Sequence, residues 1–247
     1  MLKKLTKDTF YKLGYRISRV HAPRIGVDPF SDFLHFLGPT ERPTIFDVGA
    51  NSGQSVEWFK RIWPAGQIHS FEPSPTTFEL LTQNAATYSD VHPTNAALGK
   101  ENATLELIEN TDSSMSSLRE PGKYAWGELK GKTEINVITL DDYCDQNAIE
   151  QIDVLKIDTQ GYEHEVLQGA ARMLGRHRIR LVYLELIFSE QYKNIVPADE
   201  TIGLLRKAGF QLVTIYEQFY QDDVLSWTDA LFRSTNPVDS SQNGRHH

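Results

Sequence analysis

Short apolar runs that alternate with amphipathic segments constrain the fold more than any other feature of this sequence. Runs such as TIFDV at 44–48 and IRLVYLEL at 179–186 are typical of buried strands, whereas QSVEWFKRI at 54–62 has apolar residues at helical spacing. This repetition predicts a parallel sheet covered by helices on both faces. The run TDALFR at 228–233 follows its predecessor too closely for a helical crossover, so we expect it to pair antiparallel.

The same alternation gives the expected boundaries of the remaining elements. Further strands are expected at 67–72, 91–98, 153–158 and 210–217, and further helices at 74–85, 161–174 and 198–209. Two more strands, at 103–108 and 134–139, flank the polar segment 110–132, which we interpret as an insertion with an exposed loop rather than a second domain. The predicted fold class is α/β, with a mostly parallel, doubly wound sheet and an antiparallel last strand.

The N-terminal segment differs from this alternating body in its charge. Residues 1–24 hold seven lysines and arginines and one acid, and apolar residues recur at helical spacing, interrupted by Gly14, at Phe10, Leu13, Ile17 and Val20. A second helix is expected between Asp28-Pro29 and Gly38-Pro39. The basic segment could pack on the domain, lie on an anionic membrane, or be a loosely ordered leader. We favour packing, because the rest of the chain is acidic.

Composition sets the expected organisation and setting of the chain. We expect a helical N-terminal segment over 1–40, one large domain over 41–235, and a polar, disordered tail over 236–247. The net charge of −8 is a poor match to nucleic acid, because binding there depends on neutralising phosphates. Cys144 is the single cysteine, so no disulfide can form within the chain, and a reducing, cytoplasmic location is expected.

A glycine-rich loop, FDVGANSGQS at 46–55, follows the first strand of the sheet. Ligands of doubly wound sheets bind at such strand ends, although a tight turn would also explain the glycines. A dinucleotide fingerprint needs glycine at i, i+2 and i+5, and that spacing fails here. The pattern resembles instead the first motif of S-adenosylmethionine-dependent methyltransferases. The residues expected to face that cofactor are Asp47, Gly49, Ala50, Asn51 and Gly53, with Asp47 holding its ammonium group directly or through water.

The ends of the next two strands supply further cofactor candidates. Glu72 lies about 20 residues past the glycine loop, where a carboxylate can accept hydrogen bonds from two ribose hydroxyls, and Pro73 follows it. The alternative for Glu72 is an ordinary surface acid at a strand end. Asn95 and Ala96, at the end of the third strand, are expected to border the adenine on position alone.

Seven motifs in a fixed order carry a resemblance to a known family. They are FDVGANSG, FEPSP, NAALG, SSMSSL, TLDDY, IDVLKIDTQGYEHEVLQGA and DALFR, and they extend from about Thr44 to Ser234. In this order the chain resembles FkbM-family methyltransferases. The resemblance implies a Rossmann-like, seven-stranded methyltransferase fold, S-adenosylmethionine as cofactor, and O-methylation of a sugar, a glycan or a natural product. Many members carry an acid where this chain has Gln160, and an amide cannot serve there as a base.

A hydroxyl acceptor is a weak nucleophile and benefits from a positioned base. Asp158 and Glu185 follow the fourth and fifth parallel strands and are the expected catalytic residues, although Asp158 could cap a helix and Glu185 could be a structural hydrogen-bond partner. The aromatic residues Tyr162, Trp126 and Tyr192 either line an acceptor pocket or pack. We assign no metal ligands.

Two other functions are compatible with parts of this pattern. A nicotinamide-dependent oxidoreductase would share the sheet but not the glycine spacing, and a non-catalytic scaffold could retain the cofactor residues without transferring a methyl group. The expected partner is a small-molecule or glycan acceptor, and a homo-oligomer remains open. The sequence does not identify the acceptor.

Overall fold

A computed structural model of the chain describes residue 12 and residues 25–38 and 42–236. The helix expected near Phe10 to Val20 and the tail expected from residue 236 fall almost entirely outside this described part. Within it, no helix combines the length and apolar character needed to cross a bilayer.

A seven-stranded sheet forms the centre of the molecule, in the order β3-β2-β1-β7-β8-β10-β9. The strands are β1 (Thr44–Val48), β2 (Gln67–Phe71), β3 (Val91–Thr94), β7 (Ile152–Ile157), β8 (Ile179–Ile187), β9 (Phe210–Gln221) and β10 (Val224–Ser234). The first five pair in parallel, whereas β10 pairs antiparallel with both β8 and β9. The mostly parallel sheet with an antiparallel last strand is therefore confirmed. Strand order reverses between β1 and β7.

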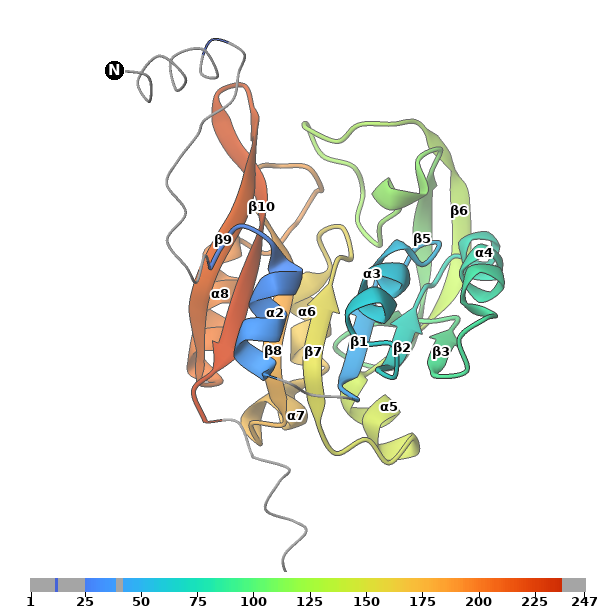
Figure 1. Cartoon of the computed structure of the whole chain (residues 1–247). Helices are drawn as coiled ribbons and strands as arrows, with labels where there is room; N and C mark the ends of the chain where they lie inside the picture. Colours follow the sequence, from blue (N-terminus) through green and yellow to red (C-terminus); the bar gives the residue numbers. More distant parts are fainter. Residues whose placement is uncertain (1–11, 13–24, 39–41, 237–247) are drawn as a thin grey trace, which may run out of the picture.

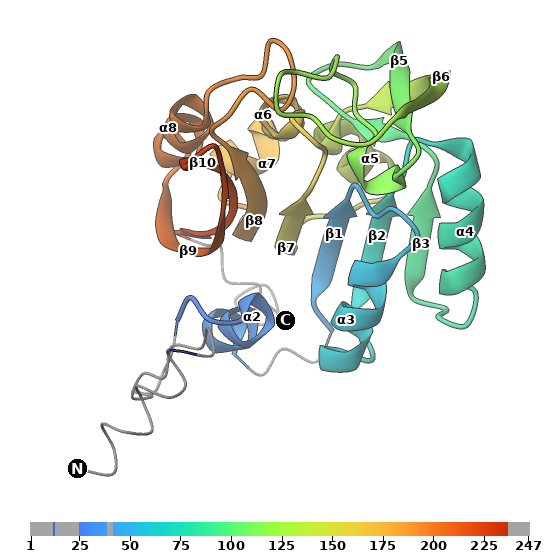
Figure 2. The ribbon, with the colours of Figure 1, turned by 90° about the horizontal axis from the view of Figure 1, so that it is seen from above.

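Helices cover both faces of the sheet, as Figure 2 shows. One face packs against α5 (Leu140–Gln146), α6 (Glu163–Gln168), α7 (Ala171–Gly175) and α8 (Ala198–Lys207). The other packs against α2 (Pro29–Leu37), α3 (Gln54–Ile62) and α4 (Pro75–Ala85). Two separate apolar cores result, because β-strand side chains alternate between faces. Buried side chains such as Phe46 and Phe33 belong to different cores.

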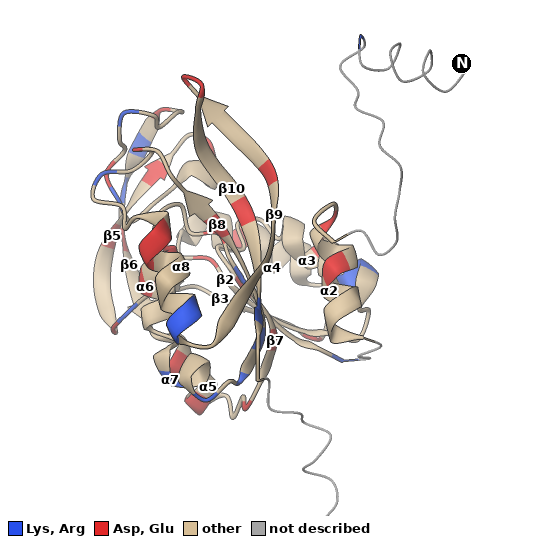
Figure 3. Cartoon of the chain, turned by 90° about the vertical axis from the view of Figure 1, so that its left-hand side faces the viewer, with Lys and Arg blue, Asp and Glu red and all other residues tan. Residues whose placement is uncertain are grey.

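Some helix ends follow local sequence chemistry and others do not. Asp28 caps α2 by accepting hydrogen bonds from the backbone amides of Phe30 and Ser31, as expected from the Asp-Pro pair. Helix α8 carries acids in its first turn and basic residues in its last, visible in Figure 3, which complements its dipole. Ser74 stands at the start of α4, but its side chain makes no capping bond and donates instead to Glu109.

The helix expected over 161–174 is broken in two. Helix α6 ends at Gln168 and α7 begins at Ala171. A β-carbon on Gly169, between them, would lie 1.9 Å from the carbonyl oxygen of Gly99, so the break brings the backbone against a neighbouring loop. The apolar spacing continued through the break, which is why periodicity did not reveal it.

The insertion forms a small second sheet, in which the two expected strands pair with each other and most of the polar segment between them is a loop. It has the order β4-β6-β5 and consists of β4 (Ala97–Leu98), β5 (Ala103–Asn110) and β6 (Leu129–Ile138), with the 3-10 helix η1 (Ser113–Met115) after β5. The strand expected over 91–98 is therefore two strands in two sheets. Asn95 lies in the turn between them, and its side-chain amide donates to the carbonyl oxygens of Glu72 and Pro73.

Strands β9 and β10 form a hairpin that is longer than the sequence predicts. The expected strands stop at residue 217 and resume at 228, whereas the ladder continues to Gln221 and resumes at Val224. Asp222 and Asp223 make the turn, both with positive φ. This conformation suits a two-residue hairpin turn, but Asp-Asp is a weaker signal for it than Asn-Gly or Asp-Gly.

Candidate functional site

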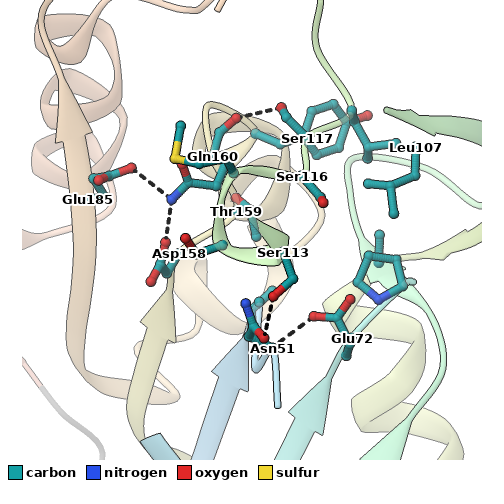
Figure 4. A pocket seen from close by; sticks show the side chains of 18 of the residues that line it. Asn51, Glu72, Leu107, Ser113, Ser116, Ser117, Asp158, Thr159, Gln160 and Glu185 are labelled. Carbon is teal, nitrogen blue, oxygen red and sulfur yellow. Dashed lines mark hydrogen bonds between the residues drawn. The ribbon is translucent and has the colours of Figure 1, made fainter. Parts of the chain in front are cut away.

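One cavity lies at the carboxyl ends of β1, β2, β7 and β8, next to the reversal in strand order. Ligands of doubly wound sheets bind at such a reversal. Figure 4 shows polar side chains from several strand ends turned toward one another around it. The residues predicted from the sequence that line it are Gly49, Asn51, Glu72, Pro73, Asp158 and Glu185, together with the aromatic candidates Trp126 and Tyr162.

The glycine loop crosses closely over the turn that carries Asp158. Gly49 has a φ of +76°, and a β-carbon there would lie 1.8 Å from the Asp158 carbonyl oxygen. Position 49 therefore requires glycine because two strand-end loops are in contact there, rather than because a ligand approaches the backbone. Gly53 has a φ of +97°, begins α3 and packs against Leu81, outside the cavity. Ala50, within the loop, is buried and does not line the cavity.

Glu72 connects the glycine loop to the end of β2. Its Oε2 accepts a hydrogen bond from the Asn51 backbone N–H at 3.0 Å, and its Oε1 accepts one from the Ser74 N–H at 2.9 Å. Burial raises the pKa of Glu72 to about 7, and Asp47 adds to the rise, although the two amide hydrogen bonds and Lys156 oppose it. Each carboxylate oxygen has a second lone pair, so both can still accept a hydroxyl from a ligand in the cavity.

Asp47 lies beneath the cavity and does not line it. Its side chain is fully buried, and Oδ1 is 3.0 Å from Nζ of Lys156, the residue beside it in the β1–β7 register. Burial would lower the pKa of Lys156, but the charges of Asp47, Asp158 and Asp229 together raise it. In this structure Asp47 therefore contacts Lys156 rather than the cavity, and its role in holding the cofactor's ammonium group, directly or through water, stays a prediction.

The residues after β3 that line the cavity lie two positions further along the chain than predicted. Asn95 and Ala96 do not line it, since the Asn95 amide is bonded to the backbone and Ala96 is buried. Ala97 and Leu98 line it instead, with Leu107 from β5. These residues make the wall beyond Glu72 apolar.

Gln160 bridges the two acids that the sequence marks as catalytic. Its Nε2 donates to Oδ1 of Asp158 at 2.9 Å and, more weakly, to Oε2 of Glu185 at 3.5 Å, as Figure 4 shows. The amide cannot rotate freely, because its Oε1 accepts the Tyr192 hydroxyl at 2.6 Å. Asp158 does not cap α6, whose first turn follows Tyr162. A neutral amide therefore holds two carboxylates on one side of the cavity.

Further acids surround this bridge. Glu163 holds the turn by accepting the backbone N–H groups of Thr159 and Gly161, and burial raises its pKa to about 7. Asp229, opposite Glu185 in the β8–β10 register, accepts a hydrogen bond from the Tyr183 hydroxyl.

Burial raises the pKa of Glu185 well above its ordinary range. The neighbouring acids Asp158, Glu163 and Asp229 raise it further, while Lys156 opposes them. The sequence feature that could have indicated this acidic cluster is Lys156, a lysine inside the apolar strand DVLKID.

The insertion forms the wall of the cavity opposite the sheet. Ser113 donates to the side chain of Asn51, and Ser117 donates to the backbone oxygen of Gln160 at 2.6 Å. Arg119 fixes the same segment by donating to the carbonyl oxygens of Gly161 and Asn194 and by pairing with Glu165. The sequence marked SSMSSL as a family motif, but not Arg119 directly after it. Among the described residues, no group of three or more histidines, cysteines and acids is placed to hold a metal ion.

Comparison with known proteins places this architecture in a family. The model of the methyltransferase FkbM domain matches residues 47–212. The 2-O-methyltransferase NoeI of Sinorhizobium fredii is 27% identical over 74% of this chain and 78% of its own length. The 31-O-demethyl-FK506 methyltransferase FkbM of Streptomyces tacrolimicus is 27% identical over 68% and 73%, and the hexuronic acid methyltransferase AglP of Haloferax volcanii is 26% identical over 65% and 61%. The match covers the glycine loop, Glu72, the insertion and both candidate catalytic acids. The chain therefore belongs to the FkbM methyltransferase family.

Proposed function

We propose that this methyltransferase transfers the methyl group of S-adenosylmethionine to a hydroxyl of a sugar, a glycan or a natural product. Two of the relatives are named as O-methyltransferases or by an O-demethyl substrate, and a third by hexuronic acid. The observation that carries the proposal is one cavity that joins Glu72 to Asp158 and Glu185. Glu72 is suited to hold the cofactor, and the two other acids are suited to accept a proton.

The residues of the cavity fit the proposed cofactor. Glu72 is a buried carboxylate with acceptor capacity left on both oxygens, which suits the two neighbouring hydroxyls of a ribose. The apolar wall of Ala97, Leu98 and Leu107 suits a flat base. When bound, S-adenosylmethionine supplies a methyl group activated by a sulfonium, and a cation of this kind is favoured beside Asp158 and Glu185.

Asp158 and Glu185 are proposed to orient the acceptor hydroxyl and to take its proton. A base is most effective when its pKa is close to the working pH, and Glu185 has its pKa raised by burial and by neighbouring acids. Gln160 keeps both carboxylates on one side of the cavity, so a hydroxyl placed there meets two acceptors. Holding the acceptor oxygen and the methyl carbon in line can lower the barrier to methyl transfer by several kcal/mol.

The proposal is tested by incubating the protein with a labelled methyl donor and cell extract, followed by identification of the labelled product. The expected product is a methyl ether. Calorimetry with S-adenosylhomocysteine on the same preparation separates two failures. Binding without any transfer would favour a non-catalytic scaffold, whereas absence of binding would remove the cofactor assignment itself.

A further inference from the structure

Three aromatic side chains, from the insertion, β9 and β10, lie against one another beside the cavity. Trp227 on β10 lies parallel to Phe219 on β9, with ring centroids 4.7 Å apart and an interplanar angle of 5°. Trp126, from the insertion, lies 5.1 Å from Trp227 at an angle of 35°. Trp126 and Trp227 line the cavity itself. We call Trp126, Phe219 and Trp227 the aromatic platform.

The platform joins two segments that are far apart in the sequence. The insertion and the β9–β10 hairpin both extend beyond the carboxyl ends of the parallel strands in Figure 1. They are tied together where Gln221 donates to the carbonyl oxygen of Tyr124 at 3.2 Å. Asn110 holds the backbone of Trp126 through a hydrogen bond of 3.0 Å. The rings are therefore presented on a prearranged support, which lowers the entropic cost of binding.

Trp227, which contacts both other rings, is half-buried and packs against the apolar cluster of Met115, Ile187 and Tyr192, whereas Trp126 and Phe219 keep exposed surface. Trp126 is 40% exposed and Phe219 is 39% exposed, although apolar surface of this size is stabilised by burial. Aromatic side chains that are exposed together, beside a cavity, mark a binding surface more often than scattered ones do. The platform continues directly into the cavity that holds Asp158 and Glu185.

The charges around the cavity limit what the platform can receive. Within the described part of the chain, the charged side chains that line the cavity are Glu72, Asp158 and Glu185, and no lysine, arginine or histidine lines it. Arg119 stands nearby, but its guanidinium is used by Glu165 and by backbone carbonyl groups. An acceptor with a carboxylate or a phosphate would therefore find no cationic partner among the residues that line the cavity and would lie beside acids.

We infer that the aromatic platform binds one face of an uncharged pyranose ring, with a ring hydroxyl directed toward Asp158 and Glu185. The face of an aromatic ring is negatively polarised and attracts the positively polarised C–H groups on one face of a sugar. The hydroxyls at the sugar's edge match carboxylate acceptors. This inference rests on the proposed function and narrows its acceptor to a neutral sugar residue of a glycan or glycoside.

Saturation-transfer NMR in the presence of S-adenosylhomocysteine tests the inference. The probes are neutral cello-, manno- and xylo-oligosaccharides, with oligogalacturonides as the anionic comparison. Ring C–H protons of at least one neutral series should receive saturation. Trp126→Ala and Trp227→Ala should each weaken that binding by up to about tenfold, as expected for the loss of a stacking contact. The matched control is Trp58→Ala, because Trp58 is 47% exposed, close to the 40% of Trp126, but lies on α3, outside the cavity.

Each outcome decides for or against the platform. Neutral binding that is lost in the two platform variants and kept in Trp58→Ala supports it. Oligogalacturonides that bind as tightly as the neutral series overturn the charge argument, and platform variants that bind like the wild type overturn the placement. No saturation of any neutral probe, with S-adenosylhomocysteine still bound by calorimetry, overturns this inference and leaves the proposed function standing.

Discussion

The side chain of residue 160 decides how two acids can share one wall of the cavity. Two carboxylates on one side of a cavity repel one another. Gln160 reduces the repulsion by donating hydrogen bonds to both Asp158 and Glu185, while Tyr192 fixes which end of the amide faces them. The residue that the sequence excludes as a base is therefore a positioning residue for both candidate bases.

Replacing this amide by an acid should move the pH dependence of turnover. Gln160→Glu removes the donor and adds a third negative charge, so the pKa of Glu185 should rise further. Because the base must be ionised to act, the acidic limb of the kcat profile should move to higher pH. A pH–rate series measures the shift, and Gln160→Met, which removes the donor without adding charge, should move it less. An unchanged profile in Gln160→Glu would contradict the bridging role.

Removal of either candidate base should affect chemistry without affecting the cofactor. At least one of Asp158→Asn and Glu185→Gln should lower kcat by roughly 10²-fold or more, the size typical of a lost acid–base group. Affinity for S-adenosylhomocysteine, measured by calorimetry, should stay close to that of the wild type. If both variants turn over normally, proton transfer at these positions is not required.

Cofactor affinity should depend on pH through Glu72. With a pKa of about 7, its carboxylate is ionised above that pH and can accept two ribose hydroxyls, whereas below it a proton occupies one oxygen. S-adenosylhomocysteine should therefore bind more weakly as pH falls from 8 to 6, by on the order of tenfold. Glu72→Gln should bind weakly at both pH values and lose the dependence. A wild-type affinity that is constant over this range would argue against the ribose assignment.

At the scale of the elements, the insertion is the part that completes the site. The sheet alone provides the strand-end residues, but the insertion closes the cavity through bonds from Ser113 and Ser117 to the two facing loops. Arg119 anchors it by donating three hydrogen bonds, and its side chain is largely buried. Loss of this anchor should leave buried acceptors without partners.

Arg119→Met should accordingly lower the free energy of unfolding by about 2–4 kcal/mol, because one member of a buried ion pair is removed. Cofactor affinity should also fall, since the freed segment contacts Asn51. Denaturant titration and calorimetry measure the two effects. Lys132→Met is the matched control, because Lys132 pairs with Glu106 and Glu120 on the exposed side of the same insertion and should change stability little.

Sequence reasoning found the elements whose signals are local and missed those set by contacts between elements. The main strands and Glu72 follow from apolar runs and from the spacing after the glycine loop. The break at Gly169, the transfer of Ala97 to a second sheet and the buried partner of Asp47 depend on what lies opposite in space. Phe219 and Trp227 were missed as a pair because the Asp-Asp turn gave no strong hairpin signal.

At the scale of the whole molecule, charge separates the N-terminal segment from the remainder of the chain. Residues 1–24 carry seven basic residues and one acid, whereas the chain as a whole has a net charge of −8. In Figure 3 acidic and basic residues are spread over the described elements, with acids at the turn between β9 and β10. Electrostatic attraction therefore favours contact between the basic segment and the acidic domain or a second copy of it.

Deletion of residues 1–24 should lower the melting temperature or change the oligomeric state measured by light scattering. Removal of the polar tail at 237–247 is the control for truncation and should change neither. Sedimentation on anionic vesicles should be the same with and without the basic segment. Retained stability together with lost vesicle binding would instead place the segment on a membrane surface.

The carboxylates that line the cavity also bear on what happens after each reaction. Such a wall attracts a donor that carries a positive sulfur, but it has no comparable hold on the uncharged thioether that remains. Loss of the methyl group therefore removes part of the attraction that brought the donor in. We expect the spent donor to bind less tightly than the donor itself, so that the same acids that prepare the acceptor also help clear the site for the next cycle.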